Sequence, residues 1–155
     1  MIDDARFMDG HEAPLRLRAL GSEDLQVISA LAQDAVFPAS EMAWRSGERR
    51  LAILLNRFRW EDRGRAEPER VRSVLVIDEV VGVRSQGIKP GDRTLILSLM
   101  SLGFEPGEDG TGTVLLTLAG DGAVSADVEA LDITLRDVTK PYTAPSRSIP
   151  KHPER

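Results

Sequence analysis

The sequence predicts an α+β protein built mainly from antiparallel strands, as a sandwich or an open barrel, with an N-terminal helix and a short C-terminal helix. Short segments with apolar and polar residues in alternation follow one another along most of the chain. Turn residues separate them, and one helical apolar pattern precedes the series while another follows it. Because consecutive strands usually pair as neighbours, this order favours an antiparallel sheet; a pleckstrin-homology-like roll is one form of it, on fold analogy alone.

Length and composition fit a small globular protein. The 155 residues are 41% apolar and 29% charged, which predicts one domain over 15–139 between a flexible N-terminal tail, 1–14, and a Pro-rich C-terminal tail, 140–155. There is no cysteine, which excludes disulfides, thiolate nucleophiles and cysteine-based metal sites. Neither a secretory signal nor an apolar run of about 18 residues is present, so we expect a cytoplasmic protein without a membrane partner.

The first two elements are a strand over 15–20 and a helix over 22–33. The strand alternates apolar and basic residues and ends at Gly21. Ser22 is suited to the N-cap, and acidic residues follow in the first turn, where the helix dipole favours them. The apolar stripe of the helix is Leu25, Ile28 and Leu31.

Three strands are expected next, over 35–37, 41–45 and 49–60. In the third, residues 51–55 are apolar at both odd and even positions, which indicates burial on both faces. Its end is amphipathic, and the aromatic and arginine side chains should point to opposite faces. The aromatic pair is Phe58 and Trp60, and the basic pair is Arg57 and Arg59.

The middle of the chain predicts more strands separated by loops. The expected strands lie over 71–83, 94–104, 113–118 and 123–128. Asp78-Glu79 interrupts the first of these, so it should be two strands or one bulged strand. The last two flank Ala119-Gly120-Asp121-Gly122, whose Asp-Gly pair is a strong signal for a tight hairpin. Residues 61–70 and 105–112 should be exposed loops, and 89–92 a turn.

The period of residues 128–138 is ambiguous. Val128, Leu131, Leu135 and Val138 lie at helical spacing, but Leu131, Ile133 and Leu135 also alternate as in a strand. We favour a short helix. In the tail that follows, the Pro150–Pro153 spacing suits a polyproline ligand of a partner protein, whereas Tyr142 favours a tail docked on its own domain.

The residue types of known catalytic and metal sites are scarce. Both histidines, His11 and His152, lie in the predicted tails, so we expect no catalytic residue, cofactor or metal ion in the domain. The acidic pairs Asp78-Glu79 and Glu108-Asp109 are expected to be solvated turn and loop residues. The glycine motif over 107–112 should be a hairpin connection, because a strand pattern follows it rather than the helix that a phosphate loop requires.

One segment has a functional character. Nine arginines and five acids lie between Arg45 and Arg72, a net charge of +4 in a chain of net charge −5. The predicted binding surface comprises Asn56, Arg57, Phe58, Arg59, Trp60, Arg63 and Arg65. The alternative without function is that solvated arginines accompany core aromatic residues.

Three functions are compatible with these residues, and the sequence leaves the ligand and the oligomeric state open. The first is a non-enzymatic binding or adaptor module that uses the arginine-rich strand end and loop to bind another protein. The second is nucleic-acid binding through the same arginines, with stacking on the aromatic residues. The third is an enzyme that uses only carboxylates and arginines, such as Asp78, Glu79 or Asp121 beside an arginine.

Four stretches of the chain resemble a known family. They are residues 33–36, 49–61, 80–88 and 119–123, and residues 56–61 (NRFRWE) are the most specific part. The chain resembles, from about Leu15 to Tyr142, a bacterial family catalogued as domain of unknown function number 2948. The resemblance implies a bacterial cytosolic origin and a compact domain, and it carries over no site residue.

Overall fold

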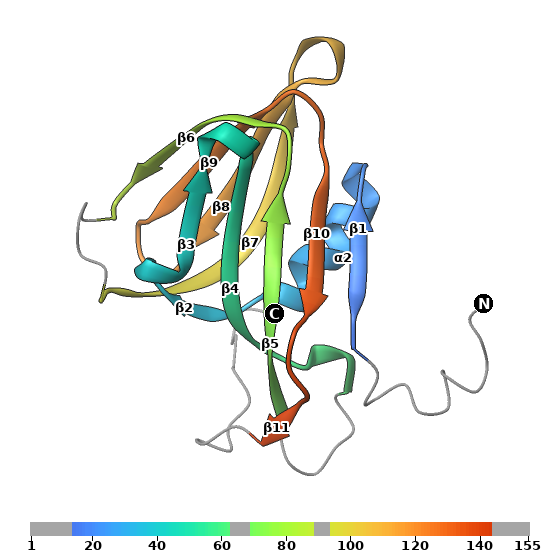
Figure 1. The fold of residues 1–155 in the computed structure, drawn as a ribbon, viewed down its shortest axis with the longest axis vertical. Coiled ribbons are helices and arrows are strands. Elements are labelled where there is room, and N and C mark those ends of the chain that lie inside the picture. Colours follow the sequence, from blue (N-terminus) through green and yellow to red (C-terminus); the bar gives the residue numbers. More distant parts are fainter. Residues whose placement is uncertain (1–13, 63–68, 89–93, 144–155) are drawn as a thin grey trace, which may run out of the picture.

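The computed structural model describes residues 14–62, 69–88 and 94–143, which form eleven strands and one α-helix (Figure 1). The strands are β1 (Arg16–Ala19), β2 (Val36–Pro38), β3 (Met42–Arg45), β4 (Arg50–Phe58), β5 (Glu69–Ile77), β6 (Val80–Gln86), β7 (Ile96–Pro106), β8 (Gly112–Leu118), β9 (Ala123–Val128), β10 (Ile133–Asp137) and β11 (Tyr142–Thr143). The α-helix is α2 (Ser22–Ala32). Four 3-10 turns are present in these ranges: η2 (Ala39–Glu41), η3 (Ser46–Glu48), η4 (Trp60–Asp62) and η5 (Glu108–Gly110).

All paired strands are antiparallel, and they form one continuous sheet. Its order is β1-β10-β5-β4-β2-β7-β8-β9-β6, with β3 on β4 and β11 on β5. The sheet curls so that the half β1-β10-β5-β4 faces the half β7-β8-β9-β6 across a single apolar core, and α2 packs against β7 and β1 (Figure 1). The predicted α+β antiparallel architecture is confirmed, and its pleckstrin-homology-like variant stays a prediction.

The alternation of residues along β4 explains how the core forms. Leu51, Ile53 and Leu55 point inward and are buried, while Ala52 and Leu54 point outward and are half-buried. Their antiparallel neighbours on β5 continue the inner row, since Ile53 lies opposite Leu75 and Leu51 opposite Ile77. The odd positions of this strand therefore mark the interior of the sheet.

The predicted turns are confirmed at two places. Leu118 N–H donates to Gly122 C=O at 3.0 Å and closes the hairpin between β8 and β9, with Gly120 at a positive φ of 79°. Asp78 and Glu79 separate β5 from β6, and Glu79 takes a positive φ of 63°. The register of β6 against β9 shifts between Val80 and Gly82, so this region contains both an interruption and a bulge.

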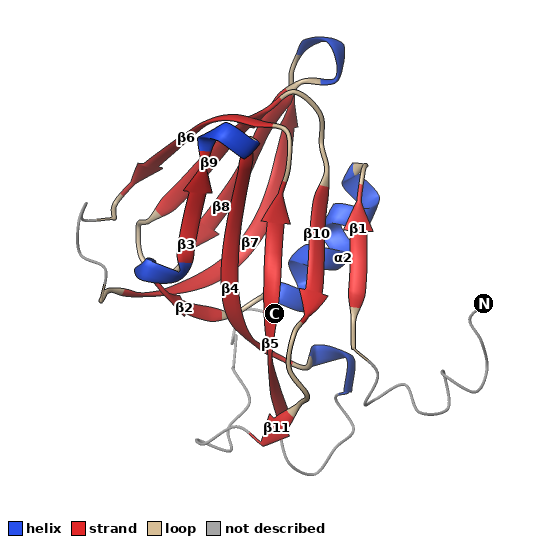
Figure 2. Cartoon of the chain, in the orientation of Figure 1, coloured by secondary structure: helices blue, strands red, loops and turns tan. Residues whose placement is uncertain are grey.

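The predicted C-terminal helix is wrong. Residues Ile133–Asp137 form strand β10, which lies between β1 and β5 (Figure 2). Ile133 and Leu135 are 0% exposed, as the strand period requires, whereas Val138, part of the helical stripe, is 42% exposed. The strand is favoured over the helix because both edges of β10 are paired. This pairing satisfies backbone groups that would otherwise be buried without partners.

Part of the C-terminal tail belongs to the sheet. Tyr142 and Thr143 form β11, opposite Arg70 and Glu69 of β5. This agrees with a docked tail for these two residues, and the Pro150–Pro153 spacing lies outside the described residues. Among the helices in the described ranges, none is long and apolar enough to cross a membrane.

Candidate binding surface

Arg57, which the sequence assigns to a binding surface, is fully buried, with 0% of its side chain exposed. Its guanidinium makes a bidentate pair with Glu61, from Nη1 to Oε1 at 2.9 Å and from Nη2 to Oε2 at 2.8 Å. Nη2 also donates to Asp137 Oδ1 at 3.0 Å, and Nε donates to Ser73 Oγ at 3.0 Å. The side chain thus connects β4 to β5, β10 and the η4 turn.

Asp137 is the second centre of this ionic cluster, which consists of Arg57, Glu61, Ser73 and Asp137; the Glu61 side chain, 28% exposed, is at its solvent side. Its Oδ1 accepts a hydrogen bond from Ser73 Oγ at 2.7 Å, and its Oδ2 accepts one from the backbone N–H of Leu15 at 2.9 Å. The cluster therefore also holds the chain where it enters β1. Its buried charges are paired and hydrogen-bonded, as the cost of removing ions from water requires.

Strand parity explains why these polar groups meet inside the protein. Arg57 continues the inner row of β4, Ser73 that of β5 and Asp137 that of β10. Asp137 lies directly opposite Ser73 in the register. The prediction that arginine and aromatic residues point to opposite faces assigned Arg57 to the solvent side, whereas the structure turns it toward the interior.

The remaining residues of the predicted surface have different environments. Arg59 is 2% exposed and donates from Nη1 to Glu69 Oε1 at 2.6 Å. Phe58 is buried and contacts the edge of Trp60, with ring centroids 4.7 Å apart. Trp60 is half-buried, and its Nε1 donates to the backbone oxygen of Gln33 at 2.8 Å.

The predicted surface is therefore not assembled as one exposed patch. Arg57, Phe58 and Arg59 are inaccessible to a partner in this conformation. Asn56 is half-buried and points outward, opposite Arg72. Arg63 and Arg65 lie outside the described residues.

The ionic cluster predicts a loss of stability in acid. Burial by itself raises the pKa of Glu61, but the hydrogen bond and charge of Arg57 outweigh it, so this pKa lies below the ordinary value of 4.5. Burial by itself lowers the pKa of Arg57, and Glu61 and Asp137 raise it overall. Because the folded state holds the ionised form of Glu61, this stabilisation is present above pH 4.5 and is lost as the pH falls through the lower folded-state pKa.

Replacing Glu61 with glutamine should flatten that dependence. We expect the free energy of unfolding of the wild-type protein, from urea titrations between pH 7 and pH 3, to decrease more steeply below pH 4.5 than that of Glu61→Gln. Glu105→Gln, a change of an exposed carboxylate, is the control and should follow the wild type. Equal slopes for wild type and Glu61→Gln would contradict the assignment.

A different set of arginines lies on the outer face of β1-β10-β5-β4. This half of the sheet is the one nearer the viewer in Figure 1. Register and parity assign to this arginine face Arg16, Arg18, Arg50, Arg70, Arg72 and Arg136. Asp132 pairs with Arg18 and Asp78 with Arg50. Among the described residues, these six arginines and two carboxylates give the face a net charge of +4, although the whole chain carries −5.

The charge is concentrated at one end of the arginine face. Arg16 and Arg136 lie directly opposite each other on β1 and β10, and both are exposed. Arg72 is the diagonal neighbour on β5, because Arg136 lies opposite Val74. Within the described residues, these three arginines and Arg70 have no carboxylate at ion-pair distance.

Half-buried aliphatic side chains form the centre of the same face. They are Leu54 on β4 and Val74 and Val76 on β5, and Leu54 lies directly opposite Val74. The face therefore has a partly apolar centre with arginines around it.

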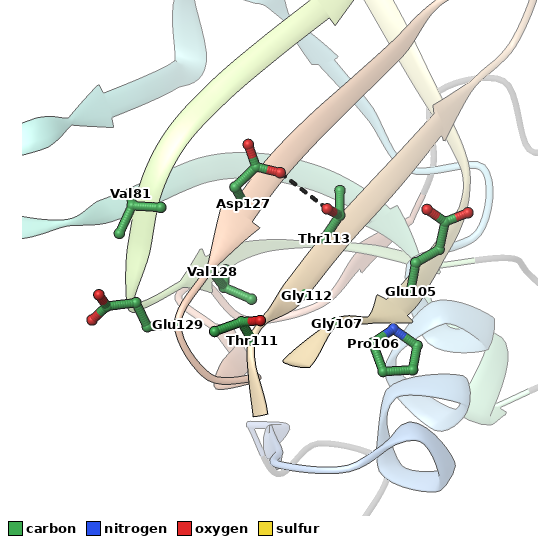
Figure 3. Close-up of a pocket in the computed structure, with 10 residues that line it drawn as sticks. All are labelled: Val81, Glu105, Pro106, Gly107, Thr111, Gly112, Thr113, Asp127, Val128 and Glu129. Carbon is green, nitrogen blue, oxygen red and sulfur yellow. Dashed lines mark hydrogen bonds between the residues drawn. The ribbon is translucent and has the colours of Figure 1, made fainter. Parts of the chain in front are cut away.

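The other sheet half carries a shallow hollow of about 540 Å³ between β6, β9 and the connection from β7 to β8 (Figure 3). Two of its carboxylates already have partners: Asp127 accepts hydrogen bonds from Thr113 and Arg84, and Glu129 pairs with Arg49. Gly107 and Gly112 of the predicted hairpin connection line it. A Cβ at Gly112 would come within 2.5 Å of the Phe104 ring, so this glycine serves close strand packing.

The described acids that the enzyme hypothesis requires do not converge. Asp78 and Glu79 lie at the turn between β5 and β6, whereas Asp121 lies in the hairpin at the start of β9. The end of β9, rather than its start, adjoins that turn, because Glu129 N–H donates to Glu79 C=O. Asp121 is thus one strand length away from the other two.

Comparison with known proteins agrees with the extent of the fold. The family model described as "Protein of unknown function (DUF2948)" matches residues 15–152, which include β1 through β11. The chain belongs to the DUF2948 family. The resemblance of the sequence to this family is thereby confirmed, and the bacterial origin that it implies stays a prediction. No curated protein and no solved structure matches the sequence.

In this DUF2948 protein, the arginine face is the feature that sequence reasoning missed. Arg16 and Arg18 lie in the first strand, Arg136 lies in the last third of the chain, and the predicted helix over 128–138 hid the pairing of β1 with β10. Had the alternation of Leu131, Ile133 and Leu135 been preferred, Arg136 would have been placed on an outer strand face.

Proposed function

We propose that this protein is a binding module that holds an acidic partner protein on its arginine face. The observation that supports this proposal is a charge asymmetry: the described residues of the face have a net charge of +4, whereas the whole chain has −5. Charge of one sign collected on one surface attracts and orients a partner of the opposite sign. Three of these arginines, Arg16, Arg72 and Arg136, are exposed and have no carboxylate at ion-pair distance within the described residues, so they are available to such a partner.

The centre of the face favours a protein over a nucleic acid. Leu54, Val74 and Val76 provide a partly apolar middle, and protein interfaces commonly combine an apolar centre with arginine. Sheets that bind single-stranded nucleic acid stack bases on aromatic side chains. On the described part of this face, Tyr142 on β11 is the exposed aromatic residue, and it lies at the margin, opposite Arg70.

This proposal keeps the hypothesis of a binding module, but it assigns the binding to the arginine face in place of the surface predicted from the sequence. Arg72 and Arg70 belong to the segment that the sequence singled out, whereas Arg16 and Arg136 come from both ends of the fold.

For the location of the protein we propose the cytoplasm, which a cysteine-free chain fits. The separation of the described acids supports binding rather than catalysis.

Fluorescence anisotropy with a labelled poly-glutamate peptide at low ionic strength tests the proposal. We expect binding that Arg136→Glu weakens by about 10-fold or more, because a favourable charge contact becomes repulsive. The matched control is Arg84→Glu, the same charge change on β6 of the other sheet half, where the side chain is also exposed. It should bind the peptide nearly as well as the wild type.

Two results would overturn this assignment. One is an equal loss of affinity in Arg84→Glu and Arg136→Glu, which would mean that only net charge matters. The other is tighter binding of a poly-thymidine oligonucleotide than of the peptide at the same salt concentration, with a steep salt dependence. That outcome would assign the arginine face to nucleic acid.

A further inference from the structure

We infer that the Arg16–Arg136 end of the arginine face is a binding site for a phosphate monoester, carried as a phosphorylated side chain by the acidic partner. This inference rests on the proposed function and names the group that the partner presents. It depends on two arginines placed opposite each other, a third on the diagonal, and a hollow that one of them, Arg136, lines.

Like charges directly opposite each other on neighbouring strands destabilise a sheet. The next outward pair in the register holds a single arginine, and there the chain itself supplies an acid. Arg18 lies opposite Thr134, and its Nε and Nη2 donate to the two carboxylate oxygens of Asp132 at 3.0 and 2.9 Å. Within the described residues, Arg16 and Arg136 have no comparable acid, and an anionic ligand would supply the missing charge.

The space for the ligand is a hollow of about 390 Å³ beside Arg136. It is lined by Pro14, which precedes β1, and by the segment from Arg136 to Lys140, which follows β10. Lys140 is exposed and adds a further cation. Asp137 also lines the hollow, but its carboxylate is engaged by Arg57, Ser73 and the Leu15 N–H.

The arrangement suits a phosphate better than a carboxylate. A phosphate monoester carries a charge of about −1.5 to −2 near pH 7 and three acceptor oxygens, so it can bridge cations on several strands at once. Arginine pairs with such groups through two parallel N–H donors. A carboxylate has two oxygens and a single charge, which leaves part of this cation cluster without a partner.

Isothermal titration with three probes tests the site. They are a short neutral peptide with one phosphoserine, the same peptide with glutamate in that position, and inorganic phosphate as a competitor. We expect the phosphopeptide to bind about 10-fold tighter than the glutamate peptide at pH 7.5. We also expect the affinity for the phosphopeptide to decrease toward pH 5.5, because the phosphate loses its second charge at a pKa of about 6. Inorganic phosphate should displace it.

The variants locate the site. Arg16→Gln and Arg136→Gln should each remove most of the preference for the phosphopeptide, whereas Arg84→Gln, an exposed arginine on the other sheet half, should keep it. Unchanged preference in both Arg16→Gln and Arg136→Gln would overturn the site. Equal affinity for phosphoserine and glutamate peptides, with poly-glutamate still bound, would overturn the phosphate site and leave the proposed function standing. Failure to bind any of these peptides would remove both.

Discussion

Replacing Arg57 with methionine should lower the free energy of unfolding by about 3–5 kcal/mol, because it leaves a buried carboxylate without its counter-charge. Arg57 is 0% exposed, and the side chain of Asp137 is 3% exposed. Methionine fills much of the same space but donates no hydrogen bond to Asp137, Glu61 or Ser73. Urea denaturation of both proteins at pH 7, monitored by tryptophan fluorescence, measures the difference.

Arg84→Met is the control for this experiment. Arg84 also pairs with a carboxylate, Asp127 at 2.8 Å, but its side chain is 63% exposed, so its loss should cost less than about 1 kcal/mol. The double variant Arg57→Met with Asp137→Leu should regain part of the loss, since it removes both buried charges together. An Arg57→Met effect as small as that of Arg84→Met would show that water reaches the cluster.

Truncation of Leu135 should destabilise the protein by about 2–5 kcal/mol, while truncation of Val138 should change its stability by less than about 1 kcal/mol. In strand β10, Leu135 points into the core between β1 and β5, whereas Val138 lies beyond the strand end and is 42% exposed. Leu135→Ala leaves a cavity in the core, and Val138→Ala does not. Chemical denaturation of both variants gives the two values.

This comparison separates the strand from a helix over the same residues. A helix would place Leu131, Leu135 and Val138 on one stripe, and both truncations would then be costly. Similar losses for Leu135→Ala and Val138→Ala would contradict the pairing of β10. Neither truncation changes a charge, and the pair between Asp132 and Arg18 beside β10 is kept in both variants.

Most of the strands could be predicted from local patterns, and the reason is physical. A strand on the wall of a core needs alternate residues to be apolar, and turns need residues such as Gly120, at a φ of 79°, that accept unusual backbone angles. Both requirements concern neighbours in sequence. The hairpin between β8 and β9 and the break at Asp78-Glu79 follow from such signals, and helix α2 follows from the helical spacing of Leu25 and Ile28.

The environment of Arg57 could not be predicted in this way. Its alternation with Phe58 shows only that the two side chains point to opposite faces, and either face is compatible with that pattern. The interior tolerates Arg57 because Asp137, 80 residues further along the chain, lies within hydrogen-bond distance. Arg57 also continues the parity of Leu51, Ile53 and Leu55, and this is the one local signal that favoured its burial.

The sequence by itself determined the class of this protein: an antiparallel α+β fold, its order of strands up to β9, its family, and a lack of cysteine chemistry. The tertiary structure decided which arginines are buried and which form a surface. Arg57 and Arg59 lie inside with acidic partners, whereas Arg16, Arg72 and Arg136 come together on the outer face through the pairing of β1, β10 and β5. Strand pairing joins residues far apart in the chain, so no local pattern contains it.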